Sequence, residues 1–182
     1  IHSFASLYNY EDSNLKRNEA LYAYASQLAA ASQWEDALTA YQELGDYQDA
    51  AVQCLTMQEA LAETAFASKD YAAALAYYIA LPQTDERKVR EYTLAQTCYD
   101  EENYQVAVEA YEALGQYELS AQRLPLARYA YANQLFQQGQ YLEACEQFSQ
   151  IKEVSDSAAR ADESKYQAAK VLQAEGQFAQ AE

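Results

Sequence analysis

The chain has 182 residues and a formal net charge of −16, from 28 acidic and 12 basic residues. Its hydrophobic fraction of 51%, with 18 Tyr, is too high for a disordered chain, and its few cations argue against nucleic acid as a partner, because phosphate binding depends on clustered Lys and Arg. Four glycines and two prolines supply too few turns for a many-stranded β protein, so the composition favours long helices.

An aromatic-x-x-Ala segment recurs along the chain and marks the second helix of a repeated helical hairpin. It occurs at Trp34–Ala37, Tyr71–Ala74, Tyr104–Ala107, Tyr141–Ala144 and Phe178–Ala181, with the aromatic residues 37, 33, 37 and 37 positions apart. An aromatic residue follows seven positions later and an aliphatic residue three further on, as Tyr41 with Leu44, Tyr78 with Leu81, Tyr111 with Leu114, and Phe148 with Ile151. These spacings place the residues on one helical face.

Each second helix follows a first helix with its own apolar stripe. The stripe consists of Tyr24-Ala25 with Leu28, Leu61-Ala62 with Ala65, Leu94-Ala95 with Cys98, and Tyr131-Ala132 with Leu135. Small Ala at the same phase of both helices lets their axes approach closely. First helices are expected to start after Tyr10–Ser13, Tyr47–Ala50, Tyr117–Ser120 and Val154–Ser157, and near Thr84 or Asp85 in the short repeat. In these segments an Asp carboxylate can accept from free amide groups, except where Leu119 replaces it.

The repeat predicts a single array over residues 1–182, cut from a longer one. Residues 1–8 are expected to be a partial helix of a preceding repeat, followed by repeats 9–45, 46–82, 83–115 and 116–152 and an incomplete last repeat, 153–182. Glycine and proline support this register. Gly45, Pro82 and Gly115 directly follow the repeated aliphatic residue of the second helix. Gly139 and Gly176 stand two positions before the repeated aromatic residue. Helices are expected to end at both of these positions.

Catalytic and metal-binding chemistry is not expected, and neither is a cofactor. The only histidine is His2, and Cys54, Cys98 and Cys145 are widely spaced, which favours reduced thiols over a disulfide framework or a metal site. The carboxylates of residues 100–102 are interpreted as a solvated helix end rather than an acid/base pair. The sequence therefore predicts that this segment is not an enzyme.

One basic cluster, Arg87, Lys88 and Arg90, lies beside Asp85, Glu86 and Glu91. We interpret it as a solvated helix start, with an anion or partner contact as the alternative. The acidic balance of the whole chain favours basic partners.

The first-helix stripe, the Gly139-Gln-Tyr141 turn and the pair Ala144 and Phe148 resemble the tetratricopeptide repeat over essentially the whole chain. The segments 44–50 (LGDYQDA) and 114–120 (LGQYELS) resemble a divergent group in bacterial, often Gram-positive, multi-repeat proteins. The chain departs from the usual repeat in its 37-residue period and in lacking the usual proline at the end of the second helix. The resemblance implies an all-α fold, a right-handed α-solenoid of antiparallel helical hairpins, whose first helices line a concave groove.

If that geometry carries over, the groove presents an aromatic stripe interrupted by polar residues. The predicted ligand-binding residues are Tyr22, Glu59, Phe66, Tyr92, Gln96, Tyr99, Tyr129, Asn133, Phe136 and Tyr166. The alternative is that these rings are periodic because each repeat packs like the last. The intervening positions do not reproduce the Lys, Asn and Arg set with which some relatives bind a terminal carboxylate, so that ligand is disfavoured.

These observations predict a non-catalytic scaffold that binds a protein or peptide partner of unknown identity on its concave face. A structural spacer between flanking domains and a tyrosine-rich carbohydrate site are the alternatives. No apolar run reaches the roughly 20 residues of a membrane span, so direct membrane insertion is not expected. The chain begins at Ile1, which leaves open a membrane anchor outside the fragment. A bacterial cytoplasmic setting and a membrane-tethered one at the cell surface both stay open.

Overall fold

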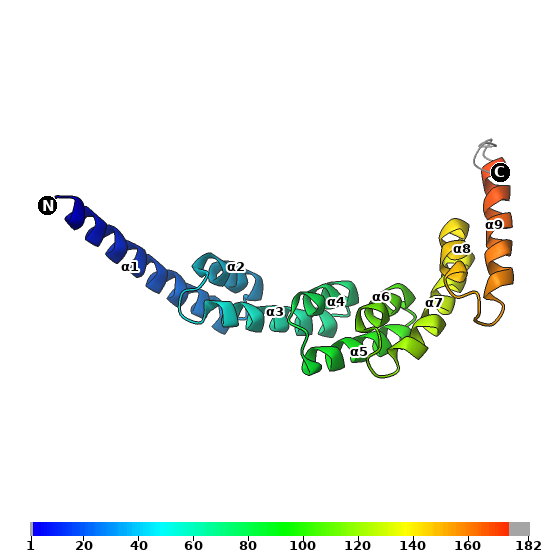
Figure 1. The fold of residues 1–182 in the computed structure, drawn as a ribbon, viewed down its shortest axis with the longest axis horizontal. Coiled ribbons are helices and arrows are strands. Elements are labelled where there is room, and N and C mark those ends of the chain that lie inside the picture. Colours follow the sequence, from blue (N-terminus) through cyan, green and yellow to red (C-terminus); the bar gives the residue numbers. More distant parts are fainter. Residues whose placement is uncertain (1, 175–182) are drawn as a thin grey trace. The chain divides into compact units, whose positions relative to one another are not determined.

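The computed structural model describes residues 2–174, with side chains from residue 13 onward. Over that range the chain is all-helical, with nine helices and no strand. They are α1 (His2–Ala30), α2 (Trp34–Leu44), α3 (Ala50–Ala67), α4 (Tyr71–Ala80), α5 (Asp85–Asp100), α6 (Tyr104–Leu114), α7 (Ser120–Gln137), α8 (Tyr141–Ser149) and α9 (Ser157–Ala174) (Figure 1). None of these helices is long and apolar enough to span a lipid bilayer. The predicted motif at Phe178–Ala181 and Gly176 lie outside the described residues.

The helices form two compact units, Ile1–Gln83 and Thr84–Glu182. In the first unit α1 packs on α2, α2 on α3 and α3 on α4, and in the second unit α5 to α9 pack in the same successive way. The division falls one residue after the boundary between the predicted repeats 46–82 and 83–115. Within each unit, neighbouring helices therefore pack in sequence order, with α1, α3, α5, α7 and α9 as the first helices and the others as second helices.

Buried alanines allow the paired helices to approach closely. The alanines at the repeated positions of both helices are all 0% exposed, namely Ala25, Ala62, Ala95 and Ala132 with Ala37, Ala74, Ala107 and Ala144. The second-helix aromatic residues pack around them, and none of Tyr41, Tyr78, Tyr111 and Phe148 is more than 3% exposed. These burials confirm the predicted register of both helices, because small residues let helix axes approach and large rings fill the remaining space.

Residues with left-handed backbone conformation end helices at fixed positions of the repeat. Gly45 and Gly115 have φ of 57°, and Gly139 has φ of 79°. The position of Gly139 is taken in the other hairpins by Ser32, Lys69 and Glu102, with φ of 58°, 64° and 62°. A non-glycine residue pays roughly 1–2 kcal/mol for this conformation. The packing of the two helices therefore imposes the turn, since the local sequence does not favour it in three of the four hairpins.

The predicted starts of the first helices are confirmed except at the first one. Helices α3, α7 and α9 begin at Ala50, Ser120 and Ser157, and α5 begins at Asp85, where the Thr84 hydroxyl accepts from the Arg87 amide at 3.1 Å. The start predicted after Tyr10–Ser13 is wrong, because α1 runs through this segment without interruption. No glycine or proline lies between residues 2 and 30, whereas Gly45 and Gly115 precede the turns before α3 and α7.

Candidate functional site

The ten residues predicted to line a groove all lie on first helices. Eight of them are half-buried, namely Tyr22, Phe66, Tyr92, Gln96, Tyr99, Tyr129, Asn133 and Phe136, while Glu59 and Tyr166 are exposed. Tyr166 has 59% of its surface exposed, and the Lys170 ammonium lies 5.5 Å from its ring centroid. Each half-buried ring thus contributes to packing and still offers part of its surface.

The half-buried rings pack edge-on, or tilted in the case of Phe66, against aromatic side chains of the second helix that follows. Tyr22, Tyr92 and Tyr129 contact the buried second-helix rings Tyr41, Tyr111 and Phe148, with centroids 5.6, 6.1 and 5.7 Å apart. Phe66, Tyr99 and Phe136 contact the rings that open the second helices, Tyr71, Tyr104 and Tyr141, at 5.7, 5.6 and 5.1 Å. Edge-to-face pairs add about 0.5–1.5 kcal/mol beyond their buried area. The stripe is therefore a packing element of every hairpin as well as a partly open surface.

Two tyrosines of the predicted aromatic stripe, Tyr22 and Tyr129, each donate a hydrogen bond to an aspartate 27 residues later. The Tyr22 hydroxyl donates to Asp49 Oδ1 at 2.5 Å, and the Tyr129 hydroxyl donates to Asp156 Oδ1 at 2.6 Å. Each aspartate stands just before the next first helix and was predicted to accept from helix amides. Asp49 makes no such bond with its side chain, and both carboxylates instead connect consecutive first helices. Tyr92 and residue 119 have the same spacing of 27 residues, but Leu119 stands where the other two pairs have an aspartate, so Tyr92 has no carboxylate to bind at that position.

These hydrogen bonds shift the pKa values of Tyr22, Asp49 and Asp156. The bond to Asp49 is the main cause that raises the pKa of Tyr22 to about 12, and the same bond lowers the pKa of Asp49 below its usual value. The Tyr129 hydroxyl likewise lowers the pKa of Asp156, with a smaller contribution from Arg160. Both aspartates are consequently held as carboxylates at neutral pH, and the Tyr22 hydroxyl is held as a donor.

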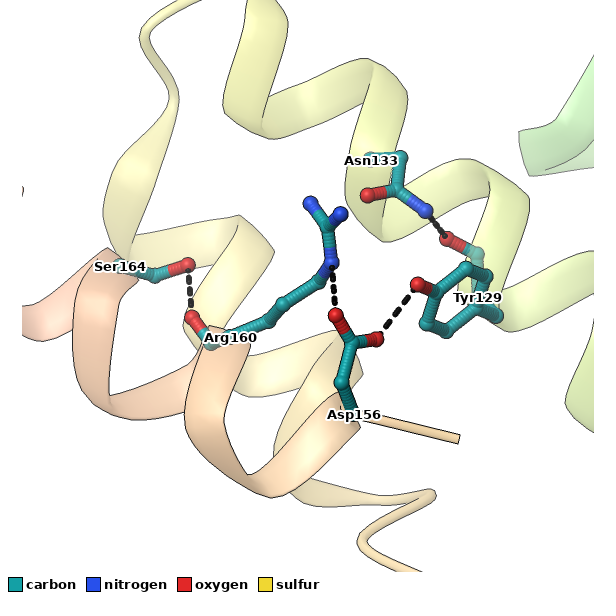
Figure 2. Close-up of polar contacts among 5 residues, drawn as sticks. All are labelled: Tyr129, Asn133, Asp156, Arg160 and Ser164. Atoms are coloured by element: carbon teal, nitrogen blue, oxygen red, sulfur yellow. Dashed lines mark hydrogen bonds and ion pairs between the residues drawn. The ribbon is translucent and has the colours of Figure 1, made fainter. Parts of the chain in front are cut away.

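The cluster around Tyr129 joins α7 to α9. Figure 2 shows Tyr129 and Arg160 reaching the Asp156 carboxylate from two sides, with Arg160 Nε donating to Oδ2 at 3.0 Å. The Arg160 guanidinium carbon lies 5.8 Å from the Tyr129 ring centroid, within the range of a cation–π contact. Asn133 Nδ2 donates to the Tyr129 carbonyl at 2.9 Å, and the Ser164 hydroxyl donates to the Arg160 carbonyl at 2.7 Å. The cluster fixes the Tyr129 side chain in place.

An open hollow of about 440 Å³ adjoins this cluster in the second unit. It is lined by Glu102, Tyr104, Tyr129, Ala130, Asn133, Gln134 and Gln137. We call it the α6–α7 hollow, because Tyr104 opens α6 and the last five of these residues belong to α7. Only Tyr129 and Asn133 among these were predicted as site residues. The others were missed because Glu102 lies in a turn, Tyr104 belongs to the second-helix repeat, and Gln134 and Gln137 do not fall at the first-helix phases predicted to face the groove.

Two buried arginines were also missed. Arg87 is 8% exposed and pairs with Glu91, which is 2% exposed, so the prediction that Arg87 belongs to a solvated helix start is wrong. Arg87 Nε and Nη2 both lie 2.8 Å from Glu91 Oε1. Arg128, 7% exposed, pairs with Glu112 and donates to the side chains of Gln147 and Gln150. Both charges are therefore neutralised inside the second unit and are structural, because unpaired charges are costly to bury.

The thiols show no sign of reactivity. Cys54, Cys98 and Cys145 are free, with Cys98 and Cys145 buried. Burial raises the pKa of Cys98 to about 12, which keeps it protonated and a poor nucleophile. In the part of the chain that the structure describes, no group of His, Cys, Asp and Glu side chains could hold a metal ion.

Comparison with known proteins leaves the chain without an assigned relative. No family model matches the sequence, and no curated protein and no solved structure matches the chain.

Proposed function

We propose that the chain is a non-catalytic scaffold that binds a protein or peptide on the face formed by its first helices. Its helical hairpins are proposed to form a right-handed α-solenoid of the tetratricopeptide type, with that face on the concave side. The observation that carries the proposal is the α6–α7 hollow, in which Tyr129 and Asn133, two of the predicted site residues, line an open space of about 440 Å³. Volumes of roughly 300–1,000 Å³ are typical of binding pockets.

The side chains of this face suit recognition of a polypeptide. Half-buried tyrosines supply apolar area at low entropic cost and keep a hydroxyl for hydrogen bonding, and tyrosine is enriched among residues that dominate binding energy. The amide side chains of Asn133, Gln134 and Gln137 can both donate to and accept from a peptide backbone. Because Tyr129 is held by Asp156 and Phe148, its ring is ordered before any ligand arrives, which lowers the entropic cost of binding.

A structural spacer is the second candidate, and the tyrosine–aspartate hydrogen bonds favour it. They connect α1 with α3 and α7 with α9, so they resist bending between consecutive hairpins. A spacer would need these bonds and would not need the hollow. The two functions therefore differ in whether a change confined to the hollow has an effect.

Truncating the stripe rings would remove packing together with any ligand contact, so the test uses an exposed polar residue. We expect Gln137→Arg, which fills the α6–α7 hollow, to abolish affinity capture of a partner from the source organism. Gln122→Arg places the same side chain on an exposed position of the same helix outside the hollow and should leave capture intact. Circular dichroism confirms that both variants fold. Equal capture by wild type and both variants would favour the spacer.

A further inference from the structure

The α6–α7 hollow has an excess of negative charge. Its lining contains one carboxylate, Glu102, together with two tyrosine rings and three carboxamides, and no lysine or arginine. The nearby Arg160 lies over the Tyr129 ring, but its charge is balanced by the Asp156 carboxylate that it contacts. Asp100 and Glu101 precede Glu102 in the sequence, and residues 84–182 carry 17 acidic against 9 basic residues. The hollow is therefore an electronegative site on an electronegative unit.

Glu102 is held in position while its carboxylate stays available. Its backbone carbonyl accepts from Gln134 Nε2 at 3.3 Å, and its backbone is left-handed, with φ of 62°. The Glu102 side chain makes no hydrogen bond or ion pair with any side chain described in the structure. The carboxylate lies close enough to Tyr104 to help raise the pKa of that phenol, after the larger effect of burial. Glu102 and Tyr104 thus border the same space.

The tyrosines of this unit already accept cations on their rings. Arg160 lies over Tyr129 at 5.8 Å, and Lys88 lies over Tyr117 at 6.0 Å. A cation within about 6 Å of a tyrosine centroid is attracted by the electron-rich ring face. Tyr104 lines the hollow and packs edge-on against Tyr99, and no cation among the described residues lies over its ring. Ring and carboxylate together form the two sides of a site for a positively charged group.

We propose that the α6–α7 hollow binds a lysine or arginine side chain of a basic peptide partner, between the Glu102 carboxylate and the Tyr104 ring. This inference rests on the proposed scaffold function and specifies its partner. The cationic head of the ligand donates to Glu102, and its aliphatic stem covers the tyrosine ring. Asn133 Oδ1 and the Gln137 amide lie beside this site and bond the peptide backbone, which sets the direction of the chain.

The test compares two glutamates in the same backbone conformation. Glu102 and Glu118 are both exposed, left-handed turn residues, with φ of 62° and 49°, but only Glu102 lines the hollow. The variants Glu102→Gln and Glu118→Gln change the net charge of the protein equally. The probe is a fluorescein-labelled, capped peptide in which lysine alternates with glycine and serine, with matched peptides that carry glutamine or glutamate in place of lysine. Fluorescence anisotropy gives the affinity, and the side-chain amide NMR signals of Asn133 and Gln137 report on the hollow itself.

We expect the lysine peptide to bind best and to shift the Asn133 and Gln137 signals. Loss of one charged hydrogen bond in Glu102→Gln should weaken binding about tenfold. Glu118→Gln, which removes only a distant screened charge, should weaken it less than about twofold. Equal weakening by both variants, or equal binding of the lysine and glutamine peptides, would overturn the inference. If the glutamine peptide alone shifts the hollow signals, the scaffold function stands and the cationic ligand falls. If no peptide shifts them and Gln137→Arg has no effect on partner capture, both fall.

Discussion

A tyrosine occupies the buried aromatic position of the second helix in several hairpins, and its hydroxyl has a hydrogen-bond partner in one hairpin but not in another. Tyr41 and Tyr111 are 2% and 1% exposed, and Phe148 takes the same position with 0% exposure. The Tyr41 hydroxyl lies 3.0 Å from Ser26 Oγ, which itself donates to the Tyr22 carbonyl at 2.9 Å, so Tyr41 is the donor of this pair. The Tyr111 hydroxyl is buried and has no hydrogen-bond partner among the residues that the structure describes.

Replacing each tyrosine by phenylalanine should therefore have opposite effects. A buried polar group without a partner costs about 1–3 kcal/mol, so Tyr111→Phe should raise the free energy of unfolding of the second unit by about 1 kcal/mol. Tyr41→Phe removes a hydrogen bond and should lower the stability of the first unit by about 0.5–1.5 kcal/mol. Phe148→Tyr is the reciprocal control, because it introduces a hydroxyl into a fully buried ring position, and it should destabilise the protein.

Urea unfolding followed by circular dichroism measures these differences, with thermal unfolding as a second readout. For a unit of this size, 1 kcal/mol corresponds to a shift in melting temperature of about 4–8 °C. Destabilisation by Tyr111→Phe comparable to that of Tyr41→Phe would refute the reasoning, since it would mean that the Tyr111 hydroxyl is bonded in solution.

Three further predictions concern the turns and the tyrosine–aspartate pairs. Leu119→Asp should give Tyr92 a carboxylate partner like those of Tyr22 and Tyr129, and urea unfolding should show the second unit stabilised by about 0.5–1.5 kcal/mol. No gain in stability would show that Tyr92 and residue 119 differ in geometry from the other two pairs. Glu102→Gly should relieve the strain of a left-handed backbone and stabilise the protein by about 0.5–1 kcal/mol. Gly139→Ala should destabilise the protein by about 1 kcal/mol through backbone strain alone, because the new Cβ meets nothing within 4 Å. Changes in stability of the same sign for both variants would contradict this account. Folding raises the pKa of Tyr22 to about 12 from an unfolded value of about 10, so its contribution to stability is complete below pH 10 and is lost as pH rises towards 12. Unfolding at stepped alkaline pH should therefore show a smaller loss of stability in Tyr22→Phe than in wild type, and equal losses would contradict this reasoning.

The repeated part of the fold could be predicted because several copies of one pattern constrain each other. The spacing alone predicts which helical face carries the buried alanines and Tyr41, because a residue that recurs on one helical face in every repeat meets an equivalent neighbour each time. The continuation of α1 through Tyr10–Ser13 could not be predicted from this pattern. A helix stops where a residue ends it or where packing folds the chain back, and this segment lacks the glycine found before the other turns.

The candidate site was less predictable than the fold, because it depends on contacts between helices. The spacing of the aromatic stripe predicts the positions of Tyr22 and Tyr129 but does not distinguish a ring packed in the core from a ring exposed to solvent. In the structure each of these rings packs against a buried ring and keeps part of its surface exposed. The sequence pattern predicts local helix caps at Asp49 and Asp156, whereas both carboxylates accept from tyrosines of the preceding first helix. A cluster of charges such as that around Arg87 is typical of a solvated surface, and the burial of Arg87 depends on how α5 packs.

The measurement that tests the central claim most directly is site-specific photo-crosslinking in the source organism. A photoreactive amino acid at Gln137 reports on the α6–α7 hollow, and the same amino acid at Gln122 reports on an exposed position of the same helix outside it. The scaffold account predicts a discrete protein adduct from position 137 that is absent from position 122. The same adducts from both positions, or none from position 137 while the full-length protein carries out its role, would contradict it.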